Sequence, residues 1–297
     1  MNIMETDNKD MARMVVGHAN NLRIHSGNII NWFSLKKGVG KKSSEELIDS
    51  VESTINAWTN SIGLDIMSIE EPLGMVDITN RSLVKKFEKD DHDKLKFSVK
   101  IFLTQWKPEL IRQAIDQVCQ SLDVTSIDSV IVSFPMTPLT DVTNNNNSTM
   151  PEFNKVKPIW KELEHLVDTG KISHIGVTDF DKQGLEELHQ WSRIKPSIDQ
   201  IGMTNCCTVP ADLIEFSKEF DIELLSHNDA PEILTARSFQ NLLQDTIQDM
   251  NANEWTPSFV ARYSVILRCR GIVEAKGYVV GAERKVSSNG VEDYGFF

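Results

Sequence analysis

The sequence predicts an α/β protein of the (β/α)8 TIM barrel class, with residues 1–297 in a single domain. Short β-branched segments alternate with amphipathic helical segments, which is typical of parallel strands joined by crossover helices. About seven or eight such units follow one another, too many for an open sheet in a chain of this length. No linker interrupts the alternation, so we expect one closed barrel.

The first predicted elements are a helix and two strands. Residues 43–58 open with serines that can cap a helix, and apolar residues then recur at helical spacing. Residues 75–79 form a weak candidate strand. Residues 95–103, LKFSVKIFL, alternate apolar and polar side chains as a half-buried strand does. These segments predict the first βα units.

From residue 108 onward, helices and strands alternate regularly. Pro108 suits the first turn of a helix, and Gly170 and Gly271 can close helices at their C-terminal ends. We expect helices at 108–122, 151–170, 181–194, 210–221 and 258–271, and strands at 126–134, 173–180, 197–203, 222–227 and 272–280. The polar tail from about residue 285 is expected to be loosely held.

Composition excludes several classes of function. A formal charge of -12 argues against a general affinity for nucleic acid or anionic membranes. No apolar run approaches the roughly 20 residues of a membrane span, and the acidic N-terminus does not resemble a secretory signal. The four cysteines lack the paired CxxC spacing of structural zinc. We therefore expect a cytoplasmic protein without a metal site.

The strand DSVIVSFP, residues 128–135, ends at Ser133, and strand ends are where barrels place their chemistry. A serine nucleophile needs a base within hydrogen-bond reach and an oxyanion hole. The G-x-S-x-G motif is absent, and the seven histidines form no recognisable triad with Ser133. We interpret Ser133 as a small strand-end residue rather than a nucleophile.

Three segments resemble strands of the aldo-keto reductase family. GKISHIGVTDF (170–180) is similar to its fifth strand, KPSIDQIG (195–202) to its sixth, and DSVIVSFP to its fourth. In that family NADPH delivers hydride to a carbonyl while a tyrosine donates a proton. A lysine and an aspartate tune the tyrosine, and a histidine orients the substrate. The resemblance therefore implies a barrel of this type, shortened at its C-terminus.

Carried onto this chain, the resemblance identifies a broken catalytic set. Lys100 matches the lysine and Asp77 the aspartate, but Ser82 stands where the tyrosine belongs and Ser133 replaces the histidine. The only tyrosines lie near the C-terminus. A serine hydroxyl is a far poorer proton donor than a phenol of pKa ~10. Losing a general acid typically lowers a rate by about 10²–10⁴-fold, so we expect Asp77 and Lys100 to be vestigial.

The residues that would hold the cofactor are also altered. The resemblance aligns Thr178, Asp179, Gln200, His227 and Lys276 with the cofactor-binding positions, and Gly277 with a family serine. Only Gln200 and Lys276 keep the family residue, and an aspartate carboxylate has no N–H to donate. We expect no cofactor, with NADPH binding as the alternative. The segment around His227 is either a capping network or a residual ligand site.

A further resemblance covers nearly the whole chain. HSGNIINW, NCCTVPADL, FDIELLSHND and ARYSVILRCRGIVEAKGY are similar to the regulatory (modifier) subunits of glutamate–cysteine ligase, an offshoot of the aldo-keto reductase fold. This implies a non-catalytic protein that forms a heterodimer with the ligase catalytic subunit. Such a subunit improves the use of glutamate and ATP and relieves feedback inhibition by glutathione. The alternative is an NADPH-dependent reductase with a non-standard proton donor.

The cysteines are candidate contacts with the partner. Cys206 and Cys207 follow the strand at 197–203, where they are either packed near the barrel rim or touch the catalytic subunit. Cys269 is expected on the last helix beside two arginines, where exposure would favour its thiolate and burial would silence it. The sequence does not predict which barrel face meets the partner.

Overall fold

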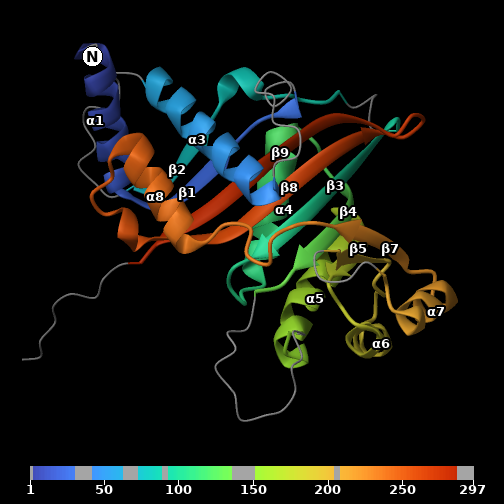
Figure 1. Cartoon of the computed structure of the whole chain (residues 1–297). Helices are drawn as coiled ribbons and strands as arrows, with labels where there is room; N and C mark the ends of the chain where they lie inside the picture. The colour runs from blue at the N-terminus through green and yellow to red at the C-terminus, as the bar shows by residue number, and fades with distance from the viewer. Residues whose placement is uncertain are drawn as a thin grey trace, which may run out of the picture.

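The computed structural model describes residues 3–30, 42–62, 73–88, 93–135, 151–203 and 208–285. These residues form an α/β structure around a nine-stranded mixed sheet of order β2-β1-β9-β8-β3-β4-β5-β6-β7, with helices on both faces (Figure 1). The strands are β1 (Ala19–His25), β2 (Leu73–Thr79), β3 (Leu95–Leu103), β4 (Ile127–Ser133), β5 (Ile172–Thr178), β6 (Ile198–Gly202), β7 (Glu223–His227), β8 (Trp255–Leu267) and β9 (Ile272–Arg284). The helices are α1 (Ile3–Gly17), α3 (Ser43–Ser61), α4 (Glu109–Leu122), α5 (Phe153–Asp168), α6 (Lys182–Trp191), α7 (Ala211–Glu219) and α8 (Ala236–Ile247), and two short 3-10 helices cover Arg81–Leu83 and Ala252–Glu254.

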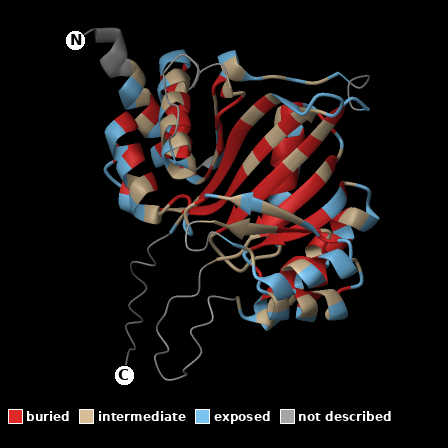
Figure 2. Ribbon diagram, turned by 45° about the vertical axis from the view of Figure 1, so that its right-hand side comes forward, coloured by how far each residue is buried: buried red, intermediate tan, exposed pale blue. Residues whose placement is uncertain are grey.

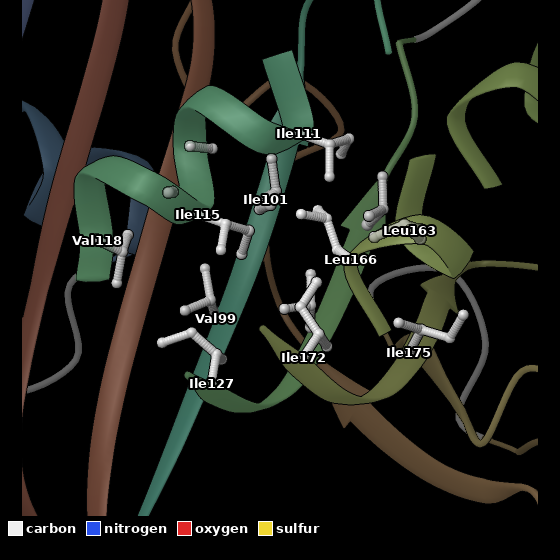
Figure 3. Packing of buried hydrophobic residues seen from close by; sticks show 14 of the residues in the cluster. Val99, Ile101, Ile111, Ile115, Val118, Ile127, Leu163, Leu166, Ile172 and Ile175 are labelled. Atoms are coloured by element: carbon white, nitrogen blue, oxygen red, sulfur yellow. The ribbon is translucent and has the colours of Figure 1, made fainter. Parts of the chain in front are cut away.

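The strands β3 to β7 are parallel neighbours in chain order. The helices α4 to α7 are the crossovers between them, as in a TIM barrel. Helix α4 packs its apolar face on the sheet through Ile111 and Ile115, which meet Val99 and Ile101 of β3 (Figure 3). The elements predicted between residues 95 and 227 are confirmed, and with them the α/β, TIM-barrel-like class.

A second core lies on the opposite face of the sheet. There α1, α3 and α8 pack against β1, β2 and the part of the hairpin β8–β9 that lies away from its turn. The buried residues of this core include Leu47, Ile55, Phe239 and Val280. Figure 2 shows that buried residues fill the central strands between the two helical layers. The centre of the sheet is thus covered on both faces.

The segment 258–271, predicted as a helix, is instead most of strand β8 and the turn that follows it. That prediction was wrong. Phe259 faces one core and Val260 faces the other, so burial on both sides removes the period-two pattern that would have marked a strand. Gly271, at φ +63°, closes the hairpin turn rather than a helix.

The hairpin β8–β9 also sets the strand order. Strand β8 pairs antiparallel with β3, and β9 pairs antiparallel with β1, so β1 and β2 run opposite to β3–β7. The order of the described strands consequently begins at β2 and ends at β7. This differs from the regular eight-unit alternation expected from the sequence.

Three sequence predictions concern residues outside the described ranges: the loose tail (286–297), Cys206 and Cys207. Within the described ranges, none of the helices combines the length and the apolar character that crossing a membrane requires.

Candidate functional site

The centre of the candidate site is a buried cluster of three charges. Lys100 of β3 donates a 2.8 Å hydrogen bond from Nζ to Asp229 Oδ2, and both side chains are about 5% exposed or less. Arg262 of β8, directly opposite Lys100 in the strand register, donates to both Asp229 oxygens at 2.5 and 2.9 Å. One carboxylate therefore serves two cations.

The environment shifts the pKa values of this cluster. Burial lowers the pKa of Lys100 to about 8, although the charge and hydrogen bond of Asp229 oppose the shift. Burial also acts to raise the pKa of Asp229, but the hydrogen bonds and charges of Arg262 and Lys100 outweigh it and hold that pKa well below its usual range. Asp229 is thus ionised at neutral pH.

Lys100, Arg262 and a buried phenol lie opposite one another on the adjacent strands β3, β8 and β9, and we call these three positions the row. Tyr278 of β9 faces Arg262 in register, is fully buried, and donates its hydroxyl proton to Glu46 Oε1 of α3 at 2.7 Å. Burial and the Glu46 carboxylate raise the pKa of Tyr278 far above 10, which makes it a weak acid. Sequence reasoning missed this tyrosine because only the hairpin register brings it into the row with Lys100. Its proton is held by Glu46 and is not directed toward a substrate.

A second set of polar groups joins the carboxyl ends of β5, β6 and β7. Asp179 follows β5, and its side chain accepts from His227 Nε2 at 3.1 Å and from the Gly202 backbone N–H at 2.7 Å. The Asp229 backbone N–H donates to His227 Nδ1 at 3.1 Å. Burial raises the pKa of Asp179, but the His227 hydrogen bond and charge lead the contributions that lower it overall.

The structure does not bring Asp77 to Lys100. Asp77 lies on β2, is about half exposed, and pairs with Arg23 of β1. Ser82 is exposed in the 3-10 turn after β2 and donates its hydroxyl to Asn80 Oδ1 at 2.6 Å. Ser133 is the half-buried last residue of β4, opposite Phe102 of β3. The carboxylate beside Lys100 is therefore Asp229, which sequence alignment did not place there.

Several residues at the cofactor-binding positions do come together. Thr178 is opposite Gln200 on adjacent strands, and Gly202 is opposite His227. Gln200 Oε1 is buried without a hydrogen-bond partner in the structure. Asp179, however, accepts from two groups of the protein itself, and its carboxylate has no N–H for a carboxamide oxygen.

The positions expected to hold the cofactor's 2′-phosphate are occupied by other contacts. Lys276 lies within β9 and pairs with Glu46 at 2.6 Å. A Cβ atom at Gly277 would lie 2.2 Å from the Gly27 carbonyl oxygen and 2.3 Å from Tyr263 Oη, so the family serine has no room there. Taken with Asp179, these residues do not fit NADPH in the way that the reductase pattern requires.

The prediction that Cys269 lies on a helix was wrong. Cys269 is exposed in the β8–β9 turn and not on a helix, while Cys119 is buried on α4. Across the residues that the structure describes, no group of three or more His, Cys, Asp or Glu side chains is arranged to hold a metal ion. Cys269 is thus an accessible thiol.

The charged and polar groups of the candidate site bind one another through ion pairs and hydrogen bonds. Lys100, Arg262 and Asp229 satisfy one another, and Tyr278, Glu46 and Lys276 form a second linked group beside them. These contacts connect β3, the hairpin β8–β9, α3 and the loop after β7. Lys100, the lysine of the reductase pattern, is therefore part of a structural network.

Known proteins show what this chain is similar to. The Aldo/keto reductase family model matches residues 77–228, about half of the chain. The glutamate–cysteine ligase regulatory subunit of Homo sapiens is 38% identical over 96% of this chain and all of its own length. The subunit of Rattus norvegicus is 39% identical with the same coverage.

Solved structures give weaker likenesses. An aldo-keto reductase from a Medee basin deep-sea metagenome library is 19% identical, covering 43% of this chain and 41% of its own, with a TM-score of 0.34. The aldose reductase of Giardia lamblia is 18% identical, covering 61% of this chain and 52% of its own, with a TM-score of 0.33. On the strength of the family model and the near full-length relatives, the chain belongs to the aldo/keto reductase family and, within it, to the glutamate–cysteine ligase regulatory subunits.

Proposed function

We propose that this protein is a non-catalytic regulatory subunit that binds the catalytic subunit of glutamate–cysteine ligase as a heterodimer. In this role it improves the use of glutamate and ATP and relieves feedback inhibition by glutathione. The names of relatives that match end to end support a regulatory role. Such an effect requires the subunit to bind one conformation of its partner more tightly than another.

One observation carries the non-catalytic part of the proposal. Lys100 is bonded to Asp229 inside the protein, and Ser82 is exposed on a turn where the reductase pattern requires a phenol. The phenol of Tyr278, which is in register with Arg262, donates its hydrogen bond to Glu46. An enzyme that reduces carbonyls needs a proton donor within reach of its substrate.

The cofactor and the location follow the same proposal. We infer that regulation requires no bound cofactor, because Asp179 and Lys276 are engaged by the protein's own groups. We also propose a cytoplasmic location, because four cysteines without paired spacing give no disulfide framework.

Reconstitution with the catalytic subunit tests the function. The two purified subunits are mixed, their complex is isolated by size-exclusion chromatography, and ligase activity is titrated with glutamate with and without this chain. We expect a lower apparent KM for glutamate and a higher glutathione concentration for half inhibition. Identical curves with and without the chain would end the regulatory proposal.

A second candidate is an NADPH-dependent reductase with a non-standard proton donor. It is favoured by the buried, unpartnered Oε1 of Gln200 and by the pKa of Lys100, which burial brings to about 8. Steady NADPH oxidation by the pure protein with aldehyde substrates would support it. Calorimetric titration with NADPH separates binding from turnover, since a nucleotide can bind without reacting.

A further inference from the structure

Strand β7 is the last strand of the described sheet, and its outer edge is the feature from which the inference starts. In an eight-unit barrel the next strand would pair with β7. Here β8 pairs with β3 and β9 instead, so β7 has β6 as its one neighbour in the described strand order. The loop after β7 leads away to α8, on the other side of the molecule (Figure 1).

The backbone directions of β7 follow from its pairing with β6. The Glu223 N–H donates to the Ser197 carbonyl at 2.9 Å, and the His227 carbonyl accepts from the Met203 N–H at 3.0 Å. In a parallel ladder, alternate residues send both backbone groups to the same side. Glu223 and His227 therefore face β6, and Leu224 and Ser226 direct their N–H and C=O groups outward. These groups form a template for another strand.

The edge is protected against strand addition by its short length and by the charge of Glu223 at its start, but by few other features. Its sequence, ELLSH, contains no proline or lysine, and its two leucines are only half buried. Phe220, just before the strand, packs against His189 with ring centroids 4.4 Å apart and the rings tilted by 50°, and it is 40% exposed. Apolar side chains thus accompany the open backbone groups.

The margin of this edge is acidic. Glu219 ends α7, Asp221 lies in the turn that follows, and Glu223 begins β7, and all three are exposed. None of them makes an ion pair with another residue in the described ranges. Two copies of this chain, each with a formal charge of -12, would repel one another, so charge disfavours a second copy and favours a basic partner.

We propose that the β7 edge binds an extended, basic segment of the ligase catalytic subunit, which adds to the sheet as a tenth strand beside the nine described. This proposal rests on the regulatory function proposed above and names the surface through which it acts. Backbone hydrogen bonds from Leu224 and Ser226 give affinity, while Phe220 and the acidic margin select an apolar and basic sequence.

The first test removes one outward N–H. Ser226→Pro takes away that donor and places a ring in the path of an added strand, whereas Ser226→Ala removes the hydroxyl and keeps the N–H. With the purified catalytic subunit, we expect Ser226→Pro to raise the Kd of the complex about tenfold or more. Ser226→Ala is expected to stay within about twofold of wild type.

The second test changes charge without touching the backbone. Glu219→Lys plus Glu223→Lys is expected to weaken the complex about tenfold at low salt, with a smaller loss at high salt. The matched control, Glu52→Lys plus Asp245→Lys, makes the same charge change on exposed residues of α3 and α8, away from β7. If Ser226→Pro does not fold, this pair of variants decides the proposal.

Hydrogen exchange gives a direct structural reading. In the complex, the amides of Leu224 and Ser226 should exchange more slowly than in the free protein. If the wild-type subunits bind and the Ser226 and charge variants bind equally well, the edge proposal is overturned while the proposed function stands. If the wild-type subunits do not associate at all, the proposed function itself fails. A wild-type homodimer that Ser226→Pro converts to a monomer would show a second copy on the edge and would also overturn the proposal.

Discussion

Lys100 and Asp229 lie 129 residues apart in the sequence and form a 2.8 Å hydrogen bond in the buried centre of the molecule. Asp229 also holds Arg262, so one carboxylate balances two cations. In the aldo-keto reductase pattern this lysine would help a tyrosine to release its proton. Here the hydrogen bond of Lys100 joins β3 to the loop after β7, so this lysine stabilises the fold.

Asp229→Asn is expected to destabilise the protein strongly. The substitution keeps the shape of the side chain but leaves two cations buried without a compensating charge, which typically costs about 3–5 kcal/mol. The free energy of unfolding in urea measures the loss. The control is Asp77→Asn, which breaks the half-exposed pair with Arg23 and should cost about 1 kcal/mol or less. Equal losses in the free energy of unfolding for the two variants would show that the buried cluster contributes no more to stability than the half-exposed pair.

Gly277→Ser, which restores the family residue, is expected to harm the fold rather than to create a phosphate site. The new Cβ would meet the Gly27 carbonyl and the Tyr263 hydroxyl at less than 2.5 Å. Overpacking of this kind costs about 1–3 kcal/mol or more. Thermal unfolding measures it, with Gly74→Ser as control because no atom lies within 4 Å of a Cβ there. A stable Gly277→Ser protein that gains affinity for NADPH would contradict this account of β9.

Asp199→Asn is expected to stabilise the protein increasingly as pH rises. Asp199 is fully buried, and neither carboxylate oxygen has a hydrogen-bond partner. Burial raises its pKa from 3.8 to about 8, with the charges of Asp179 and Asp181 adding to the shift and the backbone N–H groups of Phe180 and Gln200 opposing it. The folded state therefore retains a proton that the unfolded state loses, and the corresponding stability falls as pH rises from about 4 to about 8.

An asparagine does not ionise and avoids that loss. We compare the free energy of unfolding of Asp199→Asn with that of the wild type at each pH. We expect the advantage of the variant to be at least about 2 kcal/mol larger at pH 8 than at pH 4. Urea unfolding at a series of pH values measures the trend. Parallel curves for the two proteins would mean that Asp199 titrates normally in the folded state.

Restoring the two lost catalytic side chains is expected not to restore reduction. In a protein carrying Ser82→Tyr plus Ser133→His, the new phenol would start from an exposed turn, and Lys100 would still be bonded to Asp229. The rate of NADPH oxidation with an aldehyde should stay at the level without protein, while thermal unfolding shows that the variant is folded. Steady turnover would mean that Lys100 can leave Asp229, and it would revive the reductase hypothesis.

The parallel part of the fold was predictable because its signals are local. Helix α4 shows its apolar face at Ile111 and Ile115, and β3 alternates in its own sequence, so neither needs distant information. The hairpin β8–β9 was not predictable in this way. In β8 the consecutive residues Phe259, Val260 and Ala261 are all buried, in two cores on opposite faces, so the alternation that identifies a strand is interrupted there.

The candidate site shows the same limit. Thr178, Gln200 and His227 lie on successive parallel strands, so the strand order alone predicts that they are close together. The partnership of Lys100 with Asp229 and Arg262 depends on how a loop and a hairpin from the last third of the chain lie against β3. Nothing near Lys100 in the sequence encodes that contact, and the alignment therefore selected Asp77, which lies on the edge strand β2 and not beside β3.

The pairing of β1 with β9 has a consequence for biosynthesis. Residues 21–25 pair with residues 279–283, so β1 cannot complete its ladder until β9, more than 250 residues later, has been made. At about 5–20 residues per second, that delay lasts roughly tens of seconds. Throughout it, Leu22 and Ile24 lack the strand that later pairs with β1, so their apolar side chains are less well buried in the nascent chain. Loss of the final strand would therefore unsettle the beginning of the chain as well as its end.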